Sequence, residues 1–186
     1  MLGLKRNVVE LVDYNPEWKI LANETMARLQ SVFGTVAKDI QHIGSTAIVN
    51  IKAKPIIDIA VAINNFSEAE ALYNELESNG FSYRNWFLHN EHIIFTLGED
   101  IPPDDRITTH FIHIVKRDSS DWHNYIIFRD YLNAHYSVAK EYEALKEKMA
   151  LENPYDVGRE IYRTGKNDFV SQVLQKALVW SQQEHI

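Results

Sequence analysis

The chain has 186 residues, of which 45% are hydrophobic and 24% charged, and a formal net charge of −7. This length and composition predict one compact domain over residues 1–186. The excess of acids argues against general nucleic-acid binding, because proteins that follow a phosphate backbone gather lysine and arginine on one face. The predicted partners are therefore small molecules or other proteins, and the oligomeric state stays open.

Two absences limit the chemistry and the location. The chain has no cysteine, which excludes disulfides, thiolate nucleophiles and zinc–thiolate sites. No stretch reaches the roughly 20 apolar residues needed to cross a bilayer, and the first residues lack the apolar core of a signal peptide. We therefore expect a cytoplasmic protein without membrane contacts.

The first half of the chain alternates predicted strands and helices. Residues 8–12 predict a short strand. Asn15-Pro16-Glu17 predicts a helix start, because it offers a side-chain cap, a proline where the helix needs no amide donor, and an acid at the positive end of the helix dipole. Apolar residues at helical spacing follow, and Gly34 ends the helix. The next predicted elements are strands over 36–43 and 55–63 and a helix from the capping box Ser67/Glu70 to Gly80.

The second half changes from strands to helices. Strands are predicted over 81–88, 92–97 and 109–115, with the polar segment 98–106 as a surface loop. Helices are predicted from Ser120, over 138–151 and over 156–180, with a break at Pro154 and a kink at Gly165. The predicted fold class is α/β (α+β), a mixed sheet with flanking helices and residues 120–186 as a packed helical extension.

The most informative segment runs from His42 to Asp58. Gly44-Ser45-Thr46 follows a strand at the start of a helical turn, where backbone amides are offered to a phosphate, although a plain tight turn explains the same letters. Asp58 lies inside an apolar strand, where a carboxylate is costly unless it is hydrogen-bonded, paired or metal-bound. The alternative is that Asp58 anchors a loop or pairs with Lys54.

Two further residues of this segment are candidate phosphate ligands. Lys54 supplies a cation near Asp58, and His42 supplies an imidazole that is also a candidate base. A solvated lysine and a hydrogen-bonded core histidine are the alternative interpretations.

In combination these motifs resemble the GrpB family, predicted members of the nucleotidyltransferase superfamily, over nearly the whole chain. The resemblance is carried by Tyr14-Asn-Pro-Glu-Trp18, His42-Ile-Gly-Ser-Thr-Ala47, Ala53-Lys-Pro-Ile-Ile-Asp-Ile59, Thr109-His110, His113-Ile-Val115 and Phe128-Arg-Asp-Tyr-Leu132. It implies a nucleotidyltransferase-like fold in which the Gly-Ser turn faces an aspartate on the next strand. In active relatives, neighbouring acids hold magnesium that binds the nucleotide triphosphate.

The resemblance implies catalytic and metal-binding roles for Asp58 and His113, with Mg²⁺ or Mn²⁺ as cofactor. Position 60 shares a strand face with Asp58, but it holds Ala60 where the superfamily commonly has a second acid, which puts a two-metal site in doubt. His113 resembles the third acidic position, where imidazole can ligate a metal, act as a base, bind phosphate when protonated or serve structure alone. His110 points to the opposite face.

Other positions depart from the family pattern or extend it. Residues 48–50 read Ile-Val-Asn where the family commonly has Val-Pro-Gly, which predicts a different turn. Arg129 and Lys166 match basic family positions and can reach a phosphate over the sheet edge, or they form surface salt bridges.

Three functions remain open from the sequence. The first is an enzyme that transfers a nucleotidyl or phosphoryl group to a small acceptor. The second is a non-catalytic module that binds a nucleotide or phosphometabolite, with a link to coenzyme A metabolism because related domains are fused to dephospho-coenzyme A kinase. The third is a protein-interaction domain that uses the aromatic residues Trp122, Tyr125, Phe128 and Tyr131.

Overall fold

The computed structural model describes residues 2–89, 92–101 and 105–183. Its centre is a mixed sheet in the order β2-β3-β6-β5-β4, and β1 also pairs with β6. β3 and β6 run parallel, whereas the other described strand pairs are antiparallel. The strands are β1 (Leu4–Lys5), β2 (Asp39–Ile43), β3 (Ile57–Ile63), β4 (Ser82–His89), β5 (His92–Ile101) and β6 (Asp105–Lys116).

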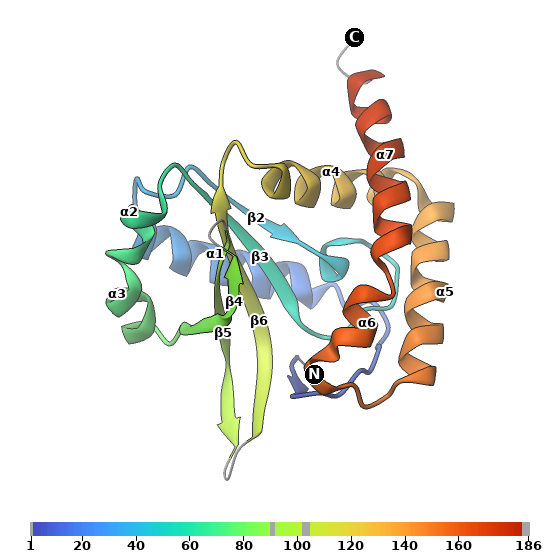
Figure 1. Cartoon of the computed structure of the whole chain (residues 1–186), viewed down its shortest axis with the longest axis horizontal. Coiled ribbons are helices and arrows are strands. Elements are labelled where there is room, and N and C mark those ends of the chain that lie inside the picture. The colour runs from blue at the N-terminus through green and yellow to red at the C-terminus, as the bar shows by residue number, and fades with distance from the viewer. Residues whose placement is uncertain (1, 90–91, 102–104, 184–186) are drawn as a thin grey trace.

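Helices flank this sheet and confirm the predicted α/β (α+β) class (Figure 1). One face packs against α1 (Glu17–Phe33), α2 (Phe66–Glu70) and α3 (Tyr73–Ser78). The other face packs against α4 (Ser120–Ala134), which in turn contacts α5 (Tyr136–Glu152) and α7 (Asn167–Gln183). Two short 3₁₀ turns, η1 (Ser45–Ala47) and η2 (Val157–Arg159), and the short helix α6 (Glu160–Thr164) complete the described elements.

The alternation of side chains along β3 separates two cores. Ile57, Ile59 and Val61 pack with Trp18 and Leu29 of α1, on what we call the α1 face. Ala60 and Ala62 instead pack with Trp122 of α4, on the α4 face. Asp58 has the same parity as the two alanines, so its carboxylate belongs to the α4 face.

The N-terminal strand and the loop 98–106 were predicted wrongly. The strand lies at Leu4–Lys5, and Val8 and Val12 form only isolated bridges with Tyr155 and Ala53. β5 and β6 continue pairing through Asp100–Arg106 and Ile101–Asp105, so the predicted loop is mostly a long hairpin, seen at the bottom of Figure 1. The Asp100–Arg106 ion pair stabilises its polar strands, and the remainder of the loop, 102–104, lies outside the described residues.

Two helix predictions were also wrong in detail. The helix predicted from Ser67 begins at Phe66 and is interrupted before Tyr73. The helix predicted over 156–180 is three pieces. Gly158 (φ 66°) and Arg159 (φ 54°) take left-handed backbone conformations at the first break, and the second break, between Thr164 and Asn167, coincides with the predicted kink at Gly165. The break at Pro154 and the helix end at Gly34 agree with the sequence. Among the described residues, none of the helices combines the length and apolar character needed to cross a bilayer.

Candidate functional site

The turn after β2 lies directly against the carboxylate of Asp58. Gly44 has φ 70° and ψ −170°, a backbone conformation that essentially only glycine adopts. A Cβ atom at Gly44 would lie 2.5 Å from Asp58 Oδ2. The glycine is therefore required both for the turn and for the close approach of the aspartate, as the sequence pattern predicts.

Asp58, His113 and His92 form a line of polar side chains. His113 lies on β6 beside Ala60 in the parallel register, and its Nε2 is 3.4 Å from Asp58 Oδ1. Its Nδ1 is 3.1 Å from Nε2 of His92 on β5. One histidine must donate and the other accept in this contact. The ring of Tyr125 covers the line, with its centroid 5.6 Å from that of His113, so the arrangement can hold or move a proton next to Asp58.

Two contiguous cavities open beside this line, and together we call them the cleft. A cavity of about 460 Å³ lies over β5 and β6, and a smaller one of about 170 Å³ reaches Ser45 and Asp58. Both are lined by Lys54, Phe111, Tyr162 and Lys166. A combined space of this size falls in the range of small-molecule sites.

The lining of the cleft is strongly cationic. Its described residues include five arginines and lysines but a single carboxylate, that of Asp58. The five are Arg6, Lys54, Arg159, Arg163 and Lys166. Because the whole chain has a net charge of −7, this concentration of positive charge is local and points to an anionic ligand.

Tyr162 brings two of the lysines together. The Nζ atoms of Lys54 and Lys166 lie 4.6 and 4.4 Å from the centroid of its ring, within the range of cation–π attraction. Burial lowers the pKa of Lys54 well below its ordinary value, and the neighbouring charges of Lys166 and Arg159 lower it further. These surroundings disfavour the charged form of Lys54, and an anion bound in the cleft would favour it.

The turn at residues 156–159 positions the C-terminal cations over the sheet. Asp156 is buried, its Oδ2 accepts a hydrogen bond from the Tyr162 amide, and its own amide donates to the Asn7 carbonyl. The side chain of Asn7 accepts from the Gly158 amide. The Arg159 guanidinium donates to the carbonyls of residues 5 and 8, so the N-terminal segment fixes this side of the cleft.

His42 and Thr46 do not join the cleft. The β2–β3 register pairs His42 with Ile59, which lies on the α1 face, whereas Asp58 pairs with Ile43. The imidazole contacts the hydroxyl of buried Thr46 at 2.9 Å. Burial lowers the pKa of His42 to about 4 despite the nearby charge of Asp58. This geometry favours the interpretation of His42 as a hydrogen-bonded core histidine.

Arg129 also serves the framework, whereas Lys166 lines the cleft. The Arg129 guanidinium donates to Gln41 Oε1 and the His42 carbonyl, each at 2.9 Å, and pairs with Asp130. These contacts tie α4 to β2. Of the two basic positions suggested by the sequence, only Lys166 is placed to meet a ligand in the cleft.

The described residues do not fit a two-metal centre. They contain no group of three or more acids and histidines placed to hold a metal ion. Ala60 occupies the position next to Asp58 on the same strand face, and Lys54 and Lys166 add positive charge to the cavity that Asp58 lines. Magnesium binds through oxygen ligands, most often carboxylates, phosphates and water, so Asp58 supplies one protein ligand where such a centre needs several.

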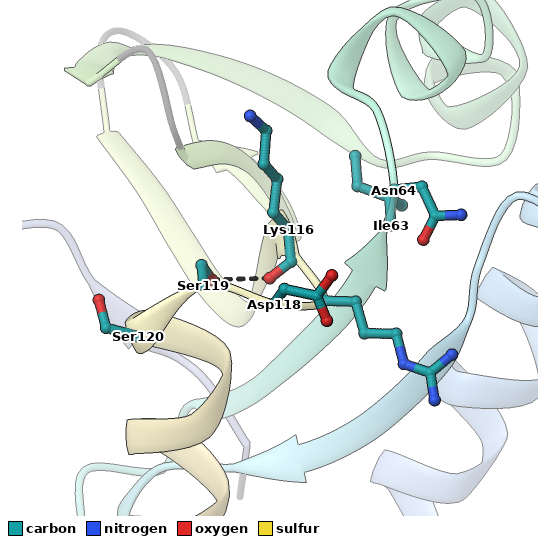
Figure 2. A pocket seen from close by; sticks show the side chains of 7 residues that line it. Ile63, Asn64, Lys116, Asp118, Ser119 and Ser120 are labelled. Atoms are coloured by element: carbon teal, nitrogen blue, oxygen red, sulfur yellow. Dashed lines mark hydrogen bonds between the residues drawn. The ribbon is translucent and has the colours of Figure 1, made fainter.

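A separate cavity of about 350 Å³ lies where β3 and β6 end and α4 begins (Figure 2). Figure 2 shows the Ser119 hydroxyl donating to the Lys116 carbonyl, at 2.7 Å. The same hydroxyl accepts from the Trp122 amide and caps α4. The Ser119 hydroxyl is thus engaged in local structure. The cleft beside Asp58, which gathers five cations, is the better candidate site.

Comparison with known proteins identifies the family and the fold of this chain. The family model described as GrpB protein matches residues 8–176. The chain belongs to the GrpB family. It is 36% identical over 177 residues to the glutamate-rich protein GrpB of Alkalihalophilus pseudofirmus, with 95% of this chain and 99% of that protein covered. The crystal structure of the conserved protein GrpB from Enterococcus faecalis superposes with a TM-score of 0.80 at 26% identity, covering 93% and 99% of the two chains.

The GrpB fold is similar to that of nucleotidyltransferases. The Cid1 poly(U) polymerase, in a crystal structure of an H336N mutant bound to MgATP, superposes with a TM-score of 0.53 at 14% identity and covers 75% of this chain and 44% of its own. At this identity the likeness concerns the fold alone. The predicted nucleotidyltransferase-like architecture is confirmed.

Sequence reasoning missed part of the cleft. Arg6, Arg159, Arg163 and Tyr162 were not predicted, because contacts between residues about 150 positions apart bring them together. The helix break at Gly158 was the one local signal. Asn50, at the family's glycine position, has φ 61°, and asparagine is among the residues that best tolerate this conformation. The backbone there is one that glycine also adopts.

Proposed function

We propose that the GrpB protein described here binds the phosphate groups of a nucleotide or related phosphometabolite in the cleft beside Asp58. The observation that carries the proposal is the set of five cations against one carboxylate in a chain of net charge −7. Arginine and lysine bind phosphate oxygens readily through charge-assisted hydrogen bonds, so a local excess of these residues favours a phosphorylated ligand.

The rest of the lining suits a nucleotide. Ser45 offers a hydroxyl at the narrow end of the cleft, next to the turn formed by Gly44. Phe111, Tyr125 and Tyr162 offer aromatic surfaces along the wider part. Aromatic rings are sequence-tolerant partners for a base, while the cations contact the phosphates.

Isothermal calorimetry with ATP, GTP, CTP, UTP and coenzyme A precursors tests this proposal. We expect at least one phosphorylated compound to bind and the matching nucleoside or dephosphorylated compound to bind much more weakly. Lys166→Met should weaken binding, whereas Lys148→Met, on the exposed side of α5, should not. Binding that ignores both the phosphates and Lys166 would contradict the proposal.

A transfer reaction is the second candidate, favoured by the line Asp58–His113–His92. In such a reaction an acceptor hydroxyl forms a bond to phosphorus while the bond to the leaving phosphate or pyrophosphate breaks. Asp58 would take the hydroxyl proton, and His113 would stabilise the protonation state of the carboxyl group. Mg²⁺ or Mn²⁺ at Asp58 and His113 stays a prediction.

Phosphorus NMR of wild type and Asp58→Asn separates binding from turnover. Incubation of a bound nucleotide with candidate acceptors, with and without Mg²⁺ or Mn²⁺, should release phosphate or pyrophosphate only in the wild type if transfer occurs. Binding without release under every condition would leave the non-catalytic module as the function.

The protein-interaction hypothesis has less support. Of the aromatic residues that suggested it, Trp122 and Tyr131 are buried. Phe128 packs on Tyr142, and Tyr125 lines the cleft. These side chains serve the core or the cleft, and they form no common exposed patch.

A further inference from the structure

The charge balance of the cleft indicates which phosphorylated ligands fit it. The inner end of the cleft, which is the smaller cavity, is lined by Lys54, Lys166, Ser45 and Asp58. Both lysines contact the ring of Tyr162. Among the described ion pairs, neither lysine has a carboxylate within 4.0 Å. An anion that enters the cleft therefore relieves their mutual repulsion.

The cations extend well beyond the reach of one phosphate group. From Lys54 and Lys166 they continue through Arg159 to Arg6 and Arg163, which are exposed at the wider cavity. A single phosphate carries at most about two negative charges near neutral pH and contacts a few donors. A chain of phosphates can contact inner and outer cations at once.

The same charges disfavour a divalent cation at Asp58. Two like charges repel strongly where the protein limits solvent screening, and Lys54 and Lys166 share the small cavity with Asp58. Nucleotide-handling sites commonly use a metal ion to neutralise phosphate charge. In this cleft Lys54 and Lys166 can supply that neutralisation.

We propose that the cleft takes a ligand with two or more consecutive phosphate groups and that Lys54 and Lys166 neutralise them without a divalent metal ion. This inference rests on the proposed function, because it specifies the ligand class of the same cleft. Asp58 then limits how far the phosphate chain can enter, since its carboxylate repels phosphate oxygens at the innermost end.

Calorimetry with inorganic phosphate, pyrophosphate and tripolyphosphate in EDTA tests the inference directly. We expect affinity to rise with the number of phosphates. Adding Mg²⁺ should weaken binding, because the metal occupies the oxygens that the lysines need. Lys54→Met and Lys166→Met should each weaken tripolyphosphate binding by roughly 10- to 100-fold, the usual effect of removing a charged hydrogen bond, whereas Lys148→Met should leave it unchanged.

Thermal unfolding without ligand provides a second readout and a check on folding. Because Lys54 is a partly buried cation beside other cations, the unliganded Lys54→Met variant should melt no lower than the wild type. Lys166→Met, which changes the other lysine of the same cavity, keeps the test possible if Lys54→Met fails to fold.

The outcomes separate the two proposals. Tripolyphosphate or nucleotide binding that appears only with Mg²⁺ or Mn²⁺ would overturn the metal-free inference and leave the proposed function standing. Equal affinity for phosphate and tripolyphosphate would also overturn it. If no phosphorylated compound binds with or without metal, the proposed function itself fails.

Discussion

The two faces of the sheet use histidine in opposite ways. On the α1 face, His110 is 6% exposed and contacts the hydroxyls of Thr25 and Thr109 at 3.3 and 2.9 Å. On the α4 face, His113 lies between a carboxylate and a second histidine at the edge of the cleft. Both residues belong to β6 and are three positions apart, so strand alternation alone sends them to different surroundings.

This comparison shows that neighbours, and not residue type, decide which polar groups form a site. Burial lowers the pKa of His110 to about 4, and the charge of Arg28 adds to the effect, so the imidazole is neutral and acts as a core hydrogen-bonding group. The α4 face keeps its polar groups in contact with an open cavity. The α1 face is framework, and the α4 face is the candidate site.

The largest expected effect is at Gly44, where the framework and the site meet. Gly44→Ala should lower the free energy of unfolding by about 3 kcal/mol or more, from a glycine-only backbone conformation and overlap with Asp58. It should also abolish ligand binding. Urea denaturation measures the first effect and calorimetry the second.

Gly80→Ala is the matched control for Gly44→Ala. Gly80 also has a positive φ, 84°, but nothing lies within 4 Å of its would-be Cβ. The Gly80→Ala variant should lose stability from backbone strain only, and it should still bind the phosphorylated ligand. Equal losses of stability in the two variants would show that the contact with Asp58 contributes nothing.

Acid should destabilise the framework through His110. The pKa of His110 in the folded chain, about 4, lies below the ordinary 6.5. Between pH 6.5 and pH 4, His110 is therefore protonated in the unfolded chain but neutral in the folded chain. The free energy of unfolding should therefore fall as pH drops through this window, by up to about 3 kcal/mol for this residue. Urea denaturation at several pH values measures the slope.

In the same experiment His110→Gln should lose less stability on acidification than the wild type. His123→Gln, at an exposed position on α4, should follow the wild type. If the wild type and His110→Gln have parallel profiles, the hydrogen-bonded neutral histidine is not the source of the acid sensitivity.

The two faces also differ in how well the sequence predicts them. The carboxylate in an apolar strand singled out Asp58, the alternation along 109–115 separated His110 from His113, and a family position suggested Lys166. These signals are local or depend on the family pattern. The turn that places Arg159 and Tyr162 depends on Asn7, which lies about 150 residues away, so periodicity predicted a helix from residue 156 with a kink at Gly165 alone.

Strand register explains the other misplacements. His42 and Gly44 are two residues apart, and only the pairing of His42 with Ile59 shows that the imidazole lies on the α1 face. The polar segment 98–106 has the composition of a loop, but cross-strand pairing with 105–108 holds most of it in a hairpin. Cross-strand pairing within the hairpin here outweighs the loop propensity of the individual residues.

A smaller effect is expected at Arg129, which belongs to α4 but ties this helix to β2 instead of lining the cleft. Arg129→Met removes its hydrogen bonds to Gln41 and the His42 carbonyl and should cost about 1–2 kcal/mol of stability. Tripolyphosphate affinity should change by less than about twofold, because the guanidinium lies outside the cleft lining. Chemical denaturation and calorimetry of the same preparation measure the two quantities, and a large loss of affinity would return Arg129 to the set of ligand-binding residues.

The smallest effects are expected from adjacent residues of η1 that belong to opposite sides of the comparison. Ser45 lines the cleft, so Ser45→Ala should weaken phosphate-ligand binding by roughly 2- to 10-fold and leave stability nearly unchanged. Thr46 is 2% exposed and contacts His42, so Thr46→Val should cost about 1 kcal/mol of stability and leave affinity unchanged. Calorimetry and urea denaturation of both variants test this reciprocal pattern. If the two substitutions affect binding and stability alike, the turn acts as one unit, and the division of the sheet into a framework face and a binding face does not extend to it.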